Sequence, residues 1–284
     1  MLIVEEIKLQ EGITDTSLIA YLQDLDFGDQ ELAGRPAVIL CPGGAYLGYT
    51  EKEVEPIALR FLSEGFQVFV LKYSIGEMAR FPAPFLDAAK AVMLVREHAR
   101  HWRIHSDRIS LCGFSTGAQV VAALGAMWQE PYLAKALNAE GDHFKPNALI
   151  LGHPVLDMER FYEKHQGKSQ EMSTLTEMMF RCIYGTATPT KKDILEWDIK
   201  SRINSTYPPT FMWTTREDSL VDVEQCLDYI NAFASKEISY EFHIFDKGAP
   251  CSGAGNPRAG NAPKWVELSL QWLGDIMGPT FTTS

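Results

Sequence analysis

The sequence lacks a long apolar run and an excess of basic residues. No apolar stretch approaches the roughly 20 residues that cross a bilayer. The amino-terminal segment 1–6 becomes acidic too early for a signal peptide, so we expect a soluble, cytoplasmic protein. The formal net charge of −11 opposes binding to nucleic acid or to an anionic membrane, because both partners require a basic surface.

Two common cofactor motifs are also missing. The five cysteines are scattered and form no Cys-x-x-Cys pair, which excludes zinc-ribbon and thioredoxin-like sites. Cys41 and Cys112 lie in apolar runs and are expected to be inert core residues. No Gly-x-Gly-x-x-Gly follows an apolar run, so a dinucleotide-dependent dehydrogenase is excluded as well. We expect no cofactor and no metal.

Apolar segments alternate with segments of helical periodicity along most of the chain. This alternation predicts an α/β fold with a mostly parallel sheet and helices on both faces. The first two strands, 2–9 and 17–25, would form an antiparallel edge. We expect one domain over 1–284, with a lid-like insertion at about 157–207, where the pattern becomes irregular. The other predicted strands are 36–41, 66–73, 108–112, 147–152, 210–214 and 239–245, and the predicted helices are 53–64, 85–102, 118–124, 223–234 and 263–277.

The segment Gly113-Phe114-Ser115-Thr116-Gly117 is the most informative part of the chain. It follows an apolar run and precedes a helix-compatible run of small residues. Strand, sharp turn and helix are the context in which Gly-x-Ser-x-Gly forms a nucleophile elbow, with a strained serine and small neighbours. Ser115 is therefore the predicted nucleophile of an acyl transfer.

Acyl transfer also needs an oxyanion hole and an acid that orients a base. We assign the oxyanion hole to the amides of Gly44 and Ala45, after the strand 36–41, and to the amide of Thr116. An ordinary Gly-Gly turn is the alternative for the first two. Asp218 follows the strand 210–214, where the order Ser, Asp, His requires an acid. A helix N-cap is the alternative role for Asp218, and Glu217 is the neighbour that could replace it.

Together these segments resemble the α/β-hydrolase superfamily, in its carboxylesterase/acetyl-xylan-esterase-like branch of small microbial esterases. The similarity extends from about residue 16 to 275. It implies the α/β-hydrolase fold, a Ser-Asp-His triad and action on small esters. The segments that carry the resemblance are CPGGAY at 41–46, GFSTG at 113–117, PPTFMW at 208–213, Glu217-Asp218 and EFHIFDKG at 241–248.

The chain departs from this family at the catalytic base. The family carries Gly-x-His-Gly after the last strand, whereas this chain reads Gly248-Ala249-Pro250-Cys251. Pro250 stands in the place of the histidine, and no histidine follows His243. Because proline cannot accept a proton, the family triad is incomplete and Ser115 lacks its expected base.

Other histidines could replace the base. His153 follows the strand 147–152 at the carboxyl edge of the sheet, where α/β folds bind ligands, so it is a candidate relocated base. A structural histidine before Pro154 is the competing interpretation. His165 lies in the insertion, and His243 is read as a structural, hydrogen-bonded residue of a strand. The group His98, His101 and His105 resembles a helical i, i+3, i+7 face, although no Asp, Glu or Cys cluster joins it.

Two functions follow from these observations. The first is a serine carboxylesterase that acts on a small acylated substrate, such as an acetylated sugar, through an atypical base or with low activity. The second is a catalytically degenerate hydrolase that binds a small molecule or a protein partner in the former substrate pocket. Homo-oligomerisation is compatible with either function.

Overall fold

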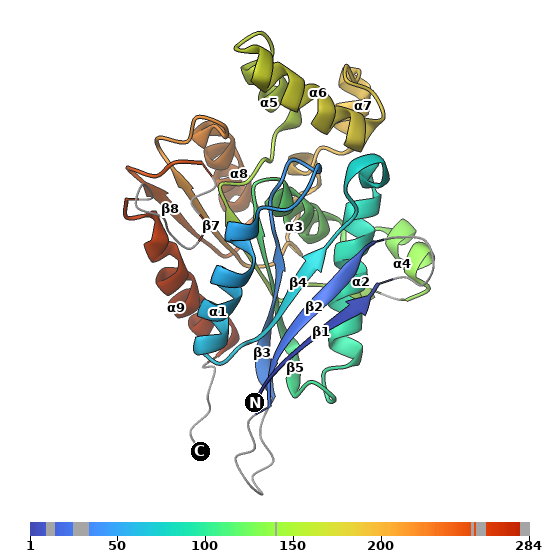
Figure 1. The fold of residues 1–284 in the computed structure, drawn as a ribbon, viewed down its shortest axis with the longest axis vertical. Coiled ribbons are helices and arrows are strands. Elements are labelled where there is room, and N and C mark those ends of the chain that lie inside the picture. The colour runs from blue at the N-terminus through green and yellow to red at the C-terminus, as the bar shows by residue number, and fades with distance from the viewer. Residues whose placement is uncertain (10–14, 25–33, 140, 251–252, 254–259, 279–284) are drawn as a thin grey trace, which may run out of the picture.

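The fold was analysed in a computed structural model, which describes residues 1–9, 15–24, 34–139, 141–250, 253 and 260–278. One eight-stranded sheet runs through the molecule in the order β1-β2-β4-β3-β5-β6-β7-β8 (Figure 1). The strands are β1 Leu2–Lys8, β2 Ser17–Gln23, β3 Arg35–Cys41, β4 Gln67–Lys72, β5 Ile104–Phe114, β6 Ala148–Gly152, β7 Thr210–Thr215 and β8 Tyr240–Phe245.

The strands β3 to β8 are mutually parallel, and the amino-terminal pair forms an antiparallel edge. β1 pairs with β2, and β2 pairs with β4, in antiparallel register. The remaining neighbours pair in parallel. The predicted fold class, with its antiparallel edge, is therefore confirmed. Apolar residues dominate the central strands because helices cover the sheet on both sides.

Two groups of helices cover the two faces of the sheet. Ile39 and Leu111 belong to the core under the helices 83–97 and 116–127, whereas Val38 and Leu40 belong to the core under the helices 55–63 and 265–277. This split follows from the alternation of side chains along a strand. The helices are α1 Glu55–Ser63, α2 Ala83–Glu97, α3 Thr116–Met127, α4 Pro131–Leu137, α5 Met158–His165, α6 Gln170–Tyr184, α7 Lys191–Glu196, α8 Val223–Ser235 and α9 Trp265–Met277.

The segment 157–207 contains the helices α5, α6 and α7, which stand together beyond one end of the sheet (Figure 1). Each begins with a capped amino terminus: Asp157 accepts from the Arg160 amide, and Ser169 accepts from the Met172 amide. Thr190 and Asp193 form a reciprocal capping box on α7. The structure thus adds three helices where the sequence predicts only an irregular segment, although the apolar residues of α5 and α6 gather on one face of each helix.

The predicted helix 85–102 is too long at its carboxyl end. α2 ends at Glu97, His98 is its C-cap, and β5 already begins at Ile104. The ring of Trp102 packs against Phe69 with centroids 5.1 Å apart, and His98 stacks on Trp102 at 5.0 Å. These contacts end the helix, although the local sequence has good helix formers. In the part of the chain that the structure describes, no helix is long and apolar enough to cross a membrane.

Candidate active site

Ser115 lies at the sharp turn between β5 and α3. Its backbone angles are φ 51° and ψ −118°, a conformation that a non-glycine residue rarely adopts. The Ser115 amide donates to the Gly152 carbonyl at 3.0 Å, and the Ser115 carbonyl accepts from the Val155 amide at 3.2 Å. The serine is thus fixed to the end of the neighbouring strand β6. This strained geometry is what the Gly-x-Ser-x-Gly pattern predicts for a nucleophile elbow.

The two glycines of the elbow have no room for a side chain. A Cβ added to Gly113 would lie 2.5 Å from the Gly117 carbonyl oxygen. One added to Gly117 would lie 2.1 Å from the carbonyl oxygen of Cys41 and 2.4 Å from that of Pro42. Both contacts are with backbone, which cannot move aside as a flexible side chain can. The expectation of small residues around the serine is therefore confirmed.

The Gly-Gly loop after β3 lies directly against the elbow. Gly44 has φ 141° and Ala45 has φ 56°, so the loop runs through two consecutive left-handed residues before Tyr46, which also has φ 59°. The loop is anchored at Pro42, whose carbonyl accepts from the Tyr73 hydroxyl at 2.7 Å. Tyr46 is buried and donates to Gln119 of α3 at 2.8 Å. The loop is more than an ordinary turn, because it is fastened to α3 and to the segment after β4.

The three predicted oxyanion donors come from these two neighbouring segments. The Ala45 amide donates to the Thr116 hydroxyl at 3.1 Å, so it would have to change partners to bind a substrate oxygen. Within the described part of the chain, no hydrogen bond is formed by the Gly44 amide. The Thr116 amide belongs to the first turn of α3 and has no intrahelical acceptor. The oxyanion roles of Gly44, Ala45 and Thr116 stay predictions.

Asp218 lies in the loop after β7 and is 8% exposed. Its Oδ1 accepts from the amides of Leu220 at 2.8 Å and Val221 at 2.9 Å. It is not the N-cap of α8, which is Asp222. Glu217, in contrast, is exposed and pairs with Arg216 at 3.6 Å. Burial and fixed orientation favour Asp218 over Glu217 as the predicted acid.

Pro250 follows β8 and lies two residues after Gly248, whose carbonyl is linked through Thr215 to the loop that carries Asp218. The Thr215 hydroxyl donates to the Gly248 carbonyl at 2.7 Å, and the Thr215 carbonyl accepts from the Asp218 amide at 3.2 Å. Thr215 therefore holds both the acid loop and the segment that precedes Pro250. Cys251, the next residue, lies outside the described residues.

His153 follows β6 with φ 34° and is 3% exposed. Its Nε2 faces Oε1 of Glu53, 3.3 Å away, without hydrogen-bond alignment. Its ring packs against Trp213 with centroids 5.3 Å apart. Among the described residues, no hydrogen bond joins His153 to the Ser115 hydroxyl. The structure thus brings His153 together with Glu53, which the sequence analysis did not single out, because no periodic pattern marks Glu53 as buried.

The environment of His153 acts on its pKa in two directions. Burial alone would lower the pKa, but the contact with Glu53 and the charges of Glu53 and Asp218 raise it above the ordinary value of 6.5. The folded state therefore binds the His153 proton more tightly than the unfolded state does. This contribution to stability is complete below pH 6.5 and disappears as the pH rises through the higher folded pKa.

We expect the free energy of unfolding to lose this His153 contribution as the pH rises above 6.5. His153→Asn, which tolerates the left-handed backbone, should lower the stability and remove that part of the pH dependence. Urea unfolding at several pH values between 6 and 9 measures the difference. The exposed His101→Asn serves as the control. Parallel stability curves for the parent and His153→Asn would contradict the expectation.

The candidate histidines His165 and His243 are held by contacts within the fold. Nε2 of His165 lies 2.8 Å from the Leu220 carbonyl, and its ring packs on Phe161 at 4.5 Å. His243 contacts Glu241 at 2.6 Å, which confirms that it is hydrogen-bonded within β8. His105 belongs to β5, so the proposed helical face of three histidines does not exist. Among the described residues, no group of three His, Cys, Asp or Glu could hold a metal ion.

Both strand cysteines are buried, and burial raises the pKa of each thiol. A raised pKa keeps a thiol protonated and therefore unreactive. Cys41 and Cys112 are accordingly inert core residues, as expected.

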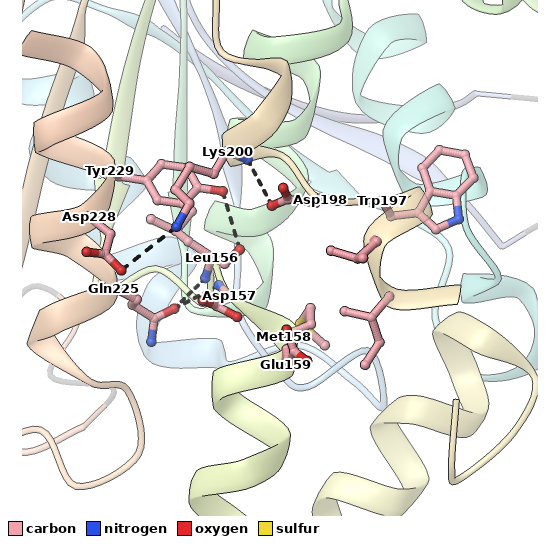
Figure 2. Close-up of a pocket in the computed structure, with 12 residues that line it drawn as sticks. Leu156, Asp157, Met158, Glu159, Trp197, Asp198, Lys200, Gln225, Asp228 and Tyr229 are labelled. Atoms are coloured by element: carbon pink, nitrogen blue, oxygen red, sulfur yellow. Dashed lines mark hydrogen bonds and ion pairs between the residues drawn. The ribbon is translucent and has the colours of Figure 1, made fainter. Parts of the chain in front are cut away.

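A cavity of about 130 Å³ lies between the segment 157–207 and α8 (Figure 2). Gln225 accepts from the amides of Leu156 and Asp157 at its wall, and Lys200 lies 3.9 Å from Asp228. These polar groups thus contact one another across the cavity wall. Ser115 does not line this cavity, which is therefore separate from the elbow.

The sequence matches the BD-FAE family model over residues 24–233, which is more than half of the chain. The match includes the Gly-Gly loop, the elbow and the Asp218 loop. The chain belongs to the BD-FAE family. Its members have the α/β-hydrolase fold, in agreement with the sheet described above. The match ends before Pro250, so it carries no information on the predicted replacement of the base.

Two curated relatives are similar to this BD-FAE family member in sequence. Endo-1,4-beta-xylanase B of Butyrivibrio fibrisolvens is 27% identical over 237 residues, which cover 82% of this chain and 34% of the xylanase. Acetylxylan esterase of Xylanibacter ruminicola is 27% identical over 124 residues, covering 43% of this chain and 23% of the esterase. The chain thus spans about a third or less of the length of these relatives.

Solved structures are similar over almost the whole chain. The acetyl ester-xyloside bifunctional hydrolase of Caldicellulosiruptor lactoaceticus is 25% identical with a TM-score of 0.78, covering 96% of this chain and 97% of its own. A carboxylesterase of Lactobacillus plantarum has the same TM-score and coverage at 23% identity, which supports the fold alone. The relatives are consistent with a carboxylic ester hydrolase, and they confirm the resemblance found in the sequence.

Proposed function

We propose that the protein is a serine carboxylesterase that hydrolyses small acyl esters at Ser115. The observation that carries the proposal is the strained Ser115 at φ 51°, held between the Gly-Gly loop and the amino terminus of α3. Attack of Oγ on the ester carbonyl would place the negative oxygen near the amides of Gly44, Ala45 and Thr116. The alcohol would then leave, and water would hydrolyse the acyl-serine.

The family histidine is replaced by Pro250, which limits this reaction. Within the described part of the chain, the Ser115 hydroxyl forms no hydrogen bond to a base. Its proton would then pass to solvent. Residual catalysis by an oxyanion hole and binding alone amounts to about 10³–10⁴-fold over water in serine proteases, so slow turnover is the expected result.

The substrate class follows from the relatives. An acetylxylan esterase and an acetyl ester-xyloside hydrolase are among them, which favours an acetylated sugar as the substrate.

The second candidate function is a degenerate hydrolase that binds a small molecule or a protein partner at this site. Pro250 in the place of the base favours it, since the serine then lacks an activating group.

Hydrolysis of p-nitrophenyl acetate separates the two functions. We expect Ser115→Ala to lower the enzymatic rate by at least about 10-fold, because the nucleophile contributes even without its base. In the parent, mass spectrometry should detect the acyl-serine intermediate as an acetyl group on Ser115. The Ser115→Ala variant should lack this adduct as well as the rate. A Ser115→Ala variant as active as the parent would leave only the binding function. Ser219→Ala, in an exposed loop position, is the matched control.

A further inference from the structure

Glu53 is a carboxylate with no exposed surface, at the end of a short 3-10 helix, Glu51–Glu53. Its Oε2 accepts from the Gly43 amide at 2.8 Å. A buried ionised carboxylate is unfavourable unless other groups compensate its charge and satisfy its oxygens. Its position beside the Gly-Gly loop therefore indicates a specific role.

His153 is the group that balances this charge. Oε1 of Glu53 lies 3.3 Å from Nε2 of His153, and the side chains are 0% and 4% exposed. Other titratable groups near the pair are Asp218, whose charge acts on His153, and the thiol of Cys112 and the hydroxyl of Tyr73 near Glu53. Burial raises the pKa of both Cys112 and Tyr73, so they stay neutral beside the carboxylate.

The Glu53 carboxylate and the Ser115 side chain both lie close to Gly43. A Cβ added to Gly43 would lie 2.9 Å from Cβ of Ser115 and 3.0 Å from Oε2 of Glu53. The Gly43 carbonyl also accepts from the Thr50 amide at 2.9 Å, so the loop is fixed on both sides of this residue. The next residues of the loop, Gly44 and Ala45, carry the predicted oxyanion amides.

We propose that Glu53 is a positioning residue for acyl transfer at Ser115. Its buried carboxylate, balanced by His153, holds the Gly43 amide and thereby the shape of the loop that presents the Gly44 and Ala45 amides. The inference rests on the proposed esterase function for its catalytic consequence and on the hydrogen bonds above for its structural part. Oxyanion donors act only when they are held in place before the charge develops, so the anchor acts on the transition state.

The structural part is tested by amide hydrogen exchange of Glu53→Gln, followed by mass spectrometry of peptides covering residues 42–46. The Gln oxygen can still accept from the Gly43 amide, but the bond loses its charge assistance and weakens, so exchange should become faster, on the order of 10- to 100-fold. Glu51→Gln, an exposed glutamate of the same short helix, should exchange like the parent. Unchanged exchange in Glu53→Gln would overturn the proposal, whatever the activity of the enzyme.

The catalytic part is tested with p-nitrophenyl acetate. Glu53→Gln should lower kcat by about 10- to 100-fold with little change in KM, since removal of an oxyanion donor costs about 10²–10³-fold and displacement costs less. If Ser115→Ala is fully active, the proposed esterase function fails while the exchange result still stands. If Ser115→Ala loses activity but Glu53→Gln keeps the kcat of the parent, the positioning role is overturned and the esterase function stands.

The double variant Glu53→Gln/His153→Asn removes both charges and guards against poor folding of either single variant. Coupling between the two sites predicts that the double variant is more stable than the sum of the two single losses. It should retain the fast exchange of residues 42–46 and the low kcat, because the anchor to Gly43 is weakened in both. Independent, additive effects of the two substitutions on stability would contradict the charge balance by His153.

Discussion

Pro250→His is expected to raise the kcat for p-nitrophenyl acetate by about 10²–10⁴-fold, the usual contribution of a general base. Position 250 lies two residues after Gly248, whose carbonyl accepts from the Thr215 hydroxyl. The carbonyl of Thr215 in turn accepts from the Asp218 amide. We therefore expect a histidine at this position to be oriented by the predicted acid.

Three measurements accompany this variant. The rate of Pro250→His should rise with pH through the histidine range near 6.5, because only the neutral imidazole accepts a proton. Pro250→Ala is the matched control, since it removes the proline ring without adding a base. The further change Ser115→Ala should abolish the gain. A Pro250→His variant no faster than Pro250→Ala would show that the missing histidine does not limit this site.

Gly117→Ala is expected to lower the free energy of unfolding by about 3 kcal/mol, at the upper end of the usual cost of overpacking. The added methyl would lie 2.1 Å from the Cys41 carbonyl oxygen and 2.4 Å from that of Pro42. Relief requires the end of β3 or the start of α3 to shift. Because those two segments carry the Gly-Gly loop and the elbow, the esterase rate should fall together with the stability.

Urea unfolding monitored by circular dichroism measures the effect. Gly274→Ala in α9 is the control, because no heavy atom lies within 4 Å of its added Cβ. That change should stabilise the protein by about 0.5–1 kcal/mol, the helical preference of alanine over glycine. Insoluble expression of Gly117→Ala agrees with the expectation, whereas a soluble variant with the parent's midpoint contradicts it.

Much of the fold follows from local pattern. The strand segments 36–41, 147–152 and 210–214 are short apolar runs bounded by Pro, Gly or Asn, and each corresponds to a central strand of the sheet. The prediction for the carboxyl end of α2 was wrong because that end is set by the packing of Trp102 on Phe69, a contact between the turn after the helix and β4. The helices α5, α6 and α7 were not predicted, although α5 and α6 each carry an apolar face that the sequence already contains.

The sequence by itself determined the local backbone elements, the Gly-x-Ser-x-Gly turn and the Gly-Gly loop, and it predicted an acid after β7 and Pro250 in the place of a base. Each depends on backbone geometry or on the identity of one residue. Only the tertiary structure decided that Glu53 and His153, 100 positions apart, meet behind the Gly43 amide. The burial and pairing of a charge depend on segments brought together by the sheet, and no local pattern encodes them.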